Sequence, residues 1–171
     1  MARAPSVVAV VLAASAWACG DPAGAEPPPP PPMEEVSVAL GVPAGDDGLG
    51  FAPLNDGDVL ELQTFGQGGT HVLVAVRAYG FGNRAFVSAS LTNLTTGKVV
   101  YEPAPARPQL LYCGSEDACD LVPYLVHASG IAGPDEERHG LEVELAAQVQ
   151  TQSYSDVAQA SCRVVLSTDR L

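Results

Sequence analysis

The sequence predicts an all-β protein, an antiparallel β-sandwich of the immunoglobulin-like kind. Apolar residues recur at every second position along several segments between residues 34 and 171, which is the period of a strand with one buried face. Gly-, Asn- and Asp-rich turn sequences separate these segments, and no segment has the 3.6-residue period of an amphipathic helix. Seven to nine short strands with this spacing are typical of a sandwich, and a small β-barrel is the alternative architecture.

The clearest strands lie near the C-terminal end of the sequence. Residues 141–149 and 160–166 both alternate apolar and polar side chains. The polar stretch 151–157 between them predicts a hairpin loop, so we expect these two strands to be antiparallel neighbours.

Two more hairpins are predicted in the middle of the chain. Val72, Val74 and Val76 fall at every second position, and Val87, Ala89 and Leu91 repeat this spacing after the glycine-containing turn 79–83. These two strands are therefore expected to pair with each other. Thr-Thr-Gly-Lys at 95–98 predicts a further turn into a strand at 99–101.

The remaining predicted strands are shorter or interrupted. Alternating apolar residues predict short strands at 36–40 and 60–62. The segment 121–128 also predicts a strand, but Pro123 lacks the N–H that a sheet requires on both sides. We therefore expect 121–128 to be an edge strand or to contain a bulge.

The N-terminus has the three parts of a secretory signal peptide, assigned here to residues 1–18. Arg3 supplies a positive charge, residues 7–14 form an unbroken apolar run, and small residues surround Trp17 before Cys19. The apolar run is too short to span a bilayer, which needs ~20 apolar residues. The segment therefore predicts export.

The residues Ala16-Trp17-Ala18-Cys19 resemble the bacterial lipobox, although Trp17 is bulky for its place in that motif. The resemblance implies a lipoprotein whose Cys19 is acylated and begins the mature chain. It also implies a cell-envelope location, which we expect to be the outer membrane, facing the periplasm or the cell surface. The alternative is an ordinary Ala-x-Ala cleavage site that releases a soluble protein.

Residues 19–33 are predicted to form a lipid-anchored, proline-rich tether. Such a tether favours a lipoprotein over a released, soluble protein. Six consecutive prolines at 27–32 predict a polyproline II segment, because proline fixes φ and lacks a donor. At ~3.1 Å per residue the prolines extend for about 19 Å. A ligand for a proline-binding domain is the alternative interpretation of this run.

Charge narrows the possible partners. The sequence has 20 acidic and 8 basic residues, and Arg3 is the only charged residue before Cys19. Such an acidic chain repels phosphate backbones, so we expect no nucleic-acid partner. The expected partners are the membrane, through the lipid, and a protein of the envelope. The sequence does not identify a small-molecule ligand.

Three cysteines follow Cys19. Cys113 and Cys119 bracket a polar loop of five residues, which predicts a structural disulfide in an oxidising compartment. That spacing matches neither the CxxC redox motif nor the usual zinc spacing. Cys162 shares the apolar face of its predicted strand and is expected to be an unpaired, buried thiol.

Metal chemistry has two possible sources in the sequence. His71, His127 and Cys119 offer nitrogen and sulfur ligands for copper or zinc, although their spacing does not require a metal. His139 follows an acidic turn and is expected to be solvated. The sequences 46–48 and 55–58 carry oxygen ligands suited to calcium but lack the EF-hand pattern, and Asp or Asn beside Gly is typical of tight turns. No metal or cofactor is therefore assigned.

One internal stretch, 56–62 with 66–72, resembles lipoproteins of deltaproteobacteria (myxobacteria) whose activity is not known. The sequence contains no Gly-x-Ser-x-Gly elbow, Ser-x-x-Lys or P-loop, so no catalytic residue is assigned and the protein is not expected to be an enzyme. The expected function is a non-catalytic, lipid-anchored envelope protein that presents a β-sandwich for binding or structure. A copper- or zinc-binding lipoprotein is the alternative, and a small hydrolase is the third interpretation.

Overall fold

A computed structural model describes residues 36–66, 69–114, 117–133 and 137–169. Within these residues the strands are β1 (Ser37–Ala44), β2 (Gly50–Pro53), β3 (Val59–Thr64), β4 (Thr70–Tyr79), β5 (Arg84–Asn93), β6 (Val99–Glu102), β7 (Gln109–Leu110), β8 (Tyr112–Cys113), β9 (Ala118–His127), β10 (Glu142–Gln150) and β11 (Val157–Ser167). The predicted signal peptide, tether and lipidation site, including Cys19, lie outside the described residues.

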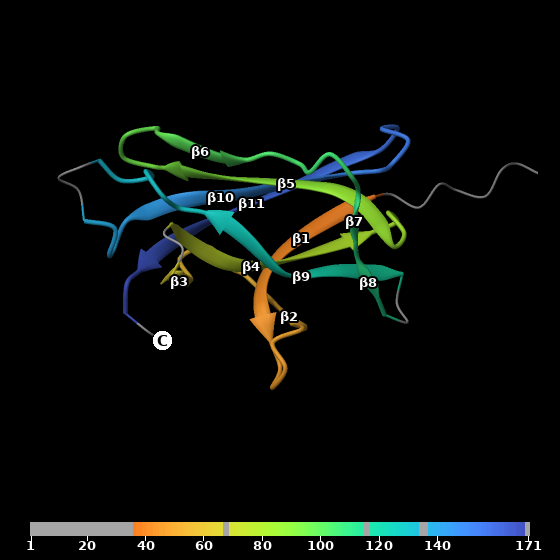
Figure 1. The fold of residues 1–171 in the computed structure, drawn as a ribbon, viewed down its shortest axis with the longest axis horizontal. Coiled ribbons are helices and arrows are strands. Elements are labelled where there is room, and N and C mark those ends of the chain that lie inside the picture. Colours follow the sequence, from red (N-terminus) through yellow and green to blue (C-terminus); the bar gives the residue numbers. More distant parts are fainter. Residues whose placement is uncertain (1–35, 67–68, 115–116, 134–136, 170–171) are drawn as a thin grey trace, which may run out of the picture. The chain divides into compact units, whose positions relative to one another are not determined.

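The strands form two sheets that face each other (Figure 1). In the first, called here the β4 sheet, β4 lies between β9 on one side and β1 and β3 on the other. Strand β2 pairs with β1, and β8 pairs with β9. In the second, the β10 sheet, β10 lies between β11 and β5, and β6 and β7 pair with the far side of β5. The predicted fold class, an all-β sandwich, is confirmed.

Strand β3 belongs to both sheets. Its first half pairs in parallel with the end of β11, and its second half pairs antiparallel with the start of β4. The β3–β11 pair is therefore an exception to the purely antiparallel arrangement that was expected. The hydrogen-bonded path through the described strands runs from β2 to β6 without closing on itself, so the alternative prediction of a small barrel is wrong.

Two of the predicted hairpins are confirmed. Strands β10 and β11 pair along nine registered positions, from Glu142 opposite Val165 to Gln150 opposite Val157. Strand β6 pairs with β5 after the predicted turn. In both cases the strands are adjacent in the sequence and the connection is short and polar, which favours a local hairpin.

The predicted pairing of β4 with β5 is wrong, because these strands lie in different sheets. The connection at 80–83 acts as a corner between the sheets, and its Phe81 is buried in the core. The inward-facing valines of β4 therefore meet the apolar residues of β5 across the core rather than side by side. A period of two identifies a buried face but does not distinguish these two arrangements.

Strand β9 is both an edge strand and a bulged one, which confirms the prediction for Pro123. Among the described strands, its far side pairs with β8 alone, at Cys119 and Asp120. The register with β4 shifts between Val74 and Val76, so that Val122 and Pro123 stand opposite a single residue of β4. Pro123 has no N–H to donate. Because it lies at a bulge on an edge strand, this loss interrupts no hydrogen bonding between two flanking strands.

The core lies between the two sheets. Every second residue of the long strands points into it. Its fully buried members include Val72, Val74, Val76, Val87, Leu91, Val126, Val143, Leu145, Val149 and Leu166. Burial of each such side chain contributes roughly 1.5–3 kcal/mol. Among the described residues, no helix is long and apolar enough to cross a membrane.

Candidate functional site

The structure brings together two of the residues that the sequence analysis considered as metal ligands without assigning a metal. His71 of β4 stands directly opposite His127 of β9. Alternation along each strand turns both imidazoles away from the core, onto the outer face of the β4 sheet. Their Nε2 atoms are 3.3 Å apart, and their ring centroids are 4.1 Å apart.

A carboxylate from the other sheet lies beside this pair. Glu102 is the last residue of β6, and its Oε2 is 4.0 Å from Nε2 of His127. The side chain of His127 is 50 % exposed and that of Glu102 is 30 % exposed, so the contact is open to solvent. Together we call His71, His127 and Glu102 the histidine–carboxylate cluster.

His71 is the more enclosed of the two histidines. The ring of Phe65 meets it edge-on, with centroids 5.4 Å apart. Gly69, at φ +97°, leaves room beside both imidazoles, since a Cβ there would lie 3.2 Å from Cε1 of His71. Burial lowers the pKa of His71, His127 lowers it further, and Glu102 opposes the shift. His71 is therefore neutral near pH 7.

Only one nitrogen of His71 is open to a ligand. Its Nδ1 is buried and has no hydrogen-bond partner among the described residues. Its Nε2 faces Nε2 of His127. A neutral imidazole with a free Nε2 lone pair is the form that binds transition metals.

Cys119, considered as a third ligand in the metal alternative, is not part of this cluster. Cys119 is disulfide-bonded to Cys113, which is the pairing expected from the sequence. It also lies eight positions before His127 on β9, and eight residues of strand span roughly 25 Å. The metal hypothesis with Cys119 as a ligand is therefore wrong.

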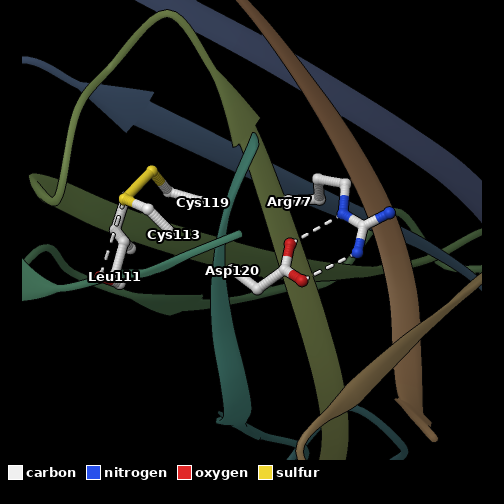
Figure 2. The surroundings of a disulfide bond; sticks show 5 residues. All are labelled: Arg77, Leu111, Cys113, Cys119 and Asp120. Carbon is white, nitrogen blue, oxygen red and sulfur yellow. Dashed lines mark hydrogen bonds and ion pairs between the residues drawn. A yellow bond between two sulfur atoms is a disulfide. The ribbon is translucent and has the colours of Figure 1, made fainter. Parts of the chain in front are cut away.

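An ion pair occupies the outer face of the sheet next to the disulfide (Figure 2). Arg77 of β4 donates to both carboxylate oxygens of Asp120, at 2.7 and 2.8 Å. Its guanidinium also lies over the ring of Phe51, 4.3 Å from the centroid. The hydrogen bonds that Arg77 donates to Asp120 raise the pKa of Arg77 above its ordinary value. Arg77 thus connects strands β4, β9 and β2.

The loops considered for calcium use their carboxylates to hold the backbone. Asp47 accepts a hydrogen bond from the N–H of Leu49, and Asp58 accepts one from the N–H of Asn55. Asp56 accepts from the N–H of Arg163 at 2.9 Å, which is the main cause of the lowered pKa of Asp56. These side chains act as turn and loop caps.

The two other residues singled out from the sequence have local contacts. Cys162 is a free, buried cysteine on the core face of β11, as predicted. His139 has a half-exposed side chain, with its Nδ1 3.3 Å from the hydroxyl of Thr168 and 3.9 Å from Asp169.

The outer face of the β10 sheet carries a hollow of about 370 Å³. Its outward-facing side chains on β5, β10 and β11 are small: Ser88, Ser90, Ala146 and Ser161. Tyr101, Glu144 and the hydrogen-bonded amides of Gln148 and Gln159 stand around it. We call this surface the serine–alanine hollow.

Sequence reasoning missed both Glu102 and this hollow. Glu102 ends a short strand and has no motif of its own, and only the packing of β6 near β9 brings it to the histidines. The hollow carries a signal in the sequence, because the polar face of each of the three strands includes serine or alanine at the positions that line it. Its members become neighbours only through the β5–β10–β11 register.

No protein-family model and no curated protein matches this sequence. The fold is similar to the CooA pilin subunit from enterotoxigenic Escherichia coli, with 12 % sequence identity and a TM-score of 0.38. That similarity covers 78 % of this chain and 99 % of the pilin chain.

Proposed function

We propose that this chain is an exported lipoprotein, anchored through Cys19, whose β-sandwich binds another envelope protein without catalysis. The signal-like residues before Cys19 and the six prolines after it support the anchor and the stalk. The Cys113–Cys119 disulfide agrees with export to an oxidising compartment.

The serine–alanine hollow is the observation that favours binding through a surface. Sheets usually present large polar side chains to solvent, whereas here small residues leave the strands of the β10 sheet open to close approach. Tyr101, 61 % exposed, stands beside the hollow. An exposed tyrosine gives a large contact area at low entropic cost, and aromatic residues are enriched in protein interfaces.

Charge indicates what kind of partner fits there. Glu144 lines the hollow, and no Lys or Arg is among its lining residues. The whole chain has 20 acidic and 8 basic residues. A basic, extended segment of an envelope protein complements this surface, whereas an anionic lipid headgroup or a nucleic acid does not.

Site-specific photo-crosslinking in isolated envelopes tests the proposal. A photoreactive amino acid at Ser90 or Ser161 should give one discrete adduct with a second protein. The same residue at Ser37, an exposed serine of β1 in the other sheet, is the matched control and should give none. The adduct should decline as salt rises, since exposed charges are screened over ~8–10 Å at ordinary ionic strength.

A blocking variant separates a specific contact from simple proximity. Ser90→Tyr fills the hollow from its outer face, so the adduct formed from Ser161 should disappear, and Ser37→Tyr should leave it unchanged. Equal adducts from Ser161 and Ser37, or an adduct that survives Ser90→Tyr, would show that the hollow is not the contact surface.

A further inference from the structure

The separation of the two histidines matches the spacing that a tetrahedral metal imposes on its ligands. Two nitrogens about 2.05 Å from a zinc ion, at the tetrahedral angle, lie about 3.3 Å apart. The Nε2 atoms of His71 and His127 are 3.3 Å apart. An ion placed between them and displaced toward solvent would therefore need little movement of either ring.

Glu102 supplies the third donor. Its Oε2 is 4.0 Å from Nε2 of His127, which is longer than the spacing between two ligands of one zinc ion. No three His, Cys, Asp or Glu side chains in the described part of the chain already converge on one point. Glu102 is partly exposed and forms an ion pair with His127, so rotation about its side-chain torsions can bring the carboxylate to the ion.

We propose that His71 and His127, through Nε2, and Glu102 bind a divalent transition-metal ion of the zinc class. Two imidazoles and one carboxylate are ligands that zinc accepts, and a water molecule completes four-coordination. The ion would join β4, β9 and β6, and so connect the two sheets at the edge that β9 leaves open.

The alternative explanation is a hydrogen bond between two neutral imidazoles, with no metal involved. That contact needs only His71 and His127, and it gives Glu102 no defined role. It also predicts that added zinc changes neither the stability of the protein nor the environment of the two rings. The two explanations are therefore distinguishable by titration.

Calorimetric titration of the full-length protein in detergent with zinc chloride tests the proposal. We expect one zinc ion per chain in the wild type. Loss of a side chain that only hydrogen-bonds to a metal ligand costs about 10–100-fold in metal affinity. His71→Gln and His127→Gln remove a ligand itself, so each should weaken zinc binding by at least as much. Glu102→Gln should give a smaller loss. His139→Gln removes the other histidine of the chain and should bind zinc as the wild type does.

Thermal unfolding distinguishes loss of zinc binding from misfolding of a variant, and X-ray absorption identifies the atoms bound to zinc. Without zinc, all four variants should melt close to the wild type, because none of these side chains belongs to the hydrophobic core. With zinc, the melting temperature should rise by mass action in the wild type and in His139→Gln, rise less in Glu102→Gln, and change little in His71→Gln and His127→Gln. X-ray absorption should show nitrogen and oxygen neighbours and no sulfur.

Three results would overturn the assignment. Zinc affinity that is unchanged in His71→Gln or His127→Gln excludes the pair as ligands. A sulfur neighbour would place the ion at a cysteine instead. Wild-type affinity in Glu102→Gln, with loss in both histidine variants, would remove Glu102 from the site. Neither histidine of the proposed zinc site lines the serine–alanine hollow, and the partner proposed for that hollow is tested by its own experiment.

Discussion

The Cys162 thiol lies on the core face of β11, only 7 % exposed. Burial raises its pKa to about 11, and a hydrogen bond to Asp56 and the negative charge of that carboxylate add to the shift. A thiol with a raised pKa stays protonated at neutral pH, and only the thiolate is an effective nucleophile or metal ligand. Cys162 is therefore chemically inert in the folded protein.

Alkylation by iodoacetamide, followed by peptide mapping, measures this directly. The rate at Cys162 in the native protein should stay low from pH 7 to pH 9 and rise only as pH approaches about 11. Asp56→Asn removes the negative charge and should move that rise to lower pH. In denaturant, the thiol should titrate near its ordinary value. Identical pH profiles in the native and unfolded protein would contradict the burial of this thiol.

Asn93, at the end of β5, is a fully buried polar residue whose amide is satisfied. Its Oδ1 accepts hydrogen bonds from the N–H groups of Thr95 and Thr96, and its Nδ2 donates to the carbonyl of Ile131. The side chain thereby fixes the turn between β5 and β6 and connects it to the loop after β9.

Asn93→Ala should lower the free energy of unfolding by about 2 kcal/mol, because it leaves the carbonyl of Ile131 without this donor and opens a small cavity. Urea denaturation measures the change. Thr92→Ala, at the neighbouring and less buried position, should cost well under 1 kcal/mol. Equal losses in the two variants would mean that the Asn93 hydrogen bonds contribute nothing specific.

At the scale of elements, the long β4–β9 pair depends on contacts across its outer face as well as on the core. Arg77 reaches from β4 to Asp120 of β9, and it stacks on Phe51 of β2. A lysine has the same charge but lacks the planar fork that makes both hydrogen bonds and the stacking contact.

Arg77→Lys should therefore destabilise the protein by about 1 kcal/mol, a modest value because the pair is partly exposed and screened by solvent. A double-mutant cycle with Asp120→Asn isolates the coupling energy. The coupling should shrink in high salt. A coupling energy of zero at low salt would show that the pair does not hold the strands together.

The elements also show where sequence reasoning reaches its limit. The β10–β11 hairpin was predictable because its strands are adjacent and its loop is short, and the edge position of β9 followed from Pro123. The pairing of β4 with β5 in one sheet was predicted wrongly. An alternating apolar pattern is expected both for two neighbouring strands of one sheet and for two strands that face each other across the core. Glu102 joins the histidines from another sheet, and no local pattern could place it there.

At the scale of the whole molecule, the two candidate surfaces are centred on different sheets and share strand β6. His71 and His127 lie on the outer face of the β4 sheet, and Glu102 of β6 reaches them from the β10 sheet. The serine–alanine hollow occupies the outer face of the β10 sheet and includes Tyr101, the residue before Glu102. The proposed envelope function depends on the predicted lipidation of Cys19, whereas the zinc proposal does not.

The chemical structure of the mature N-terminal residue is the most direct test of the proposed lipid anchor. Mass spectrometry of protein from the membrane fraction should show an N-terminal peptide that begins at Cys19 and carries diacylglycerol. Cys19→Ser should leave the protein exported but soluble or unprocessed. An unmodified Cys19 in the mature protein, or a Cys19→Ser variant that partitions with membranes as the wild type does, would contradict the lipoprotein account.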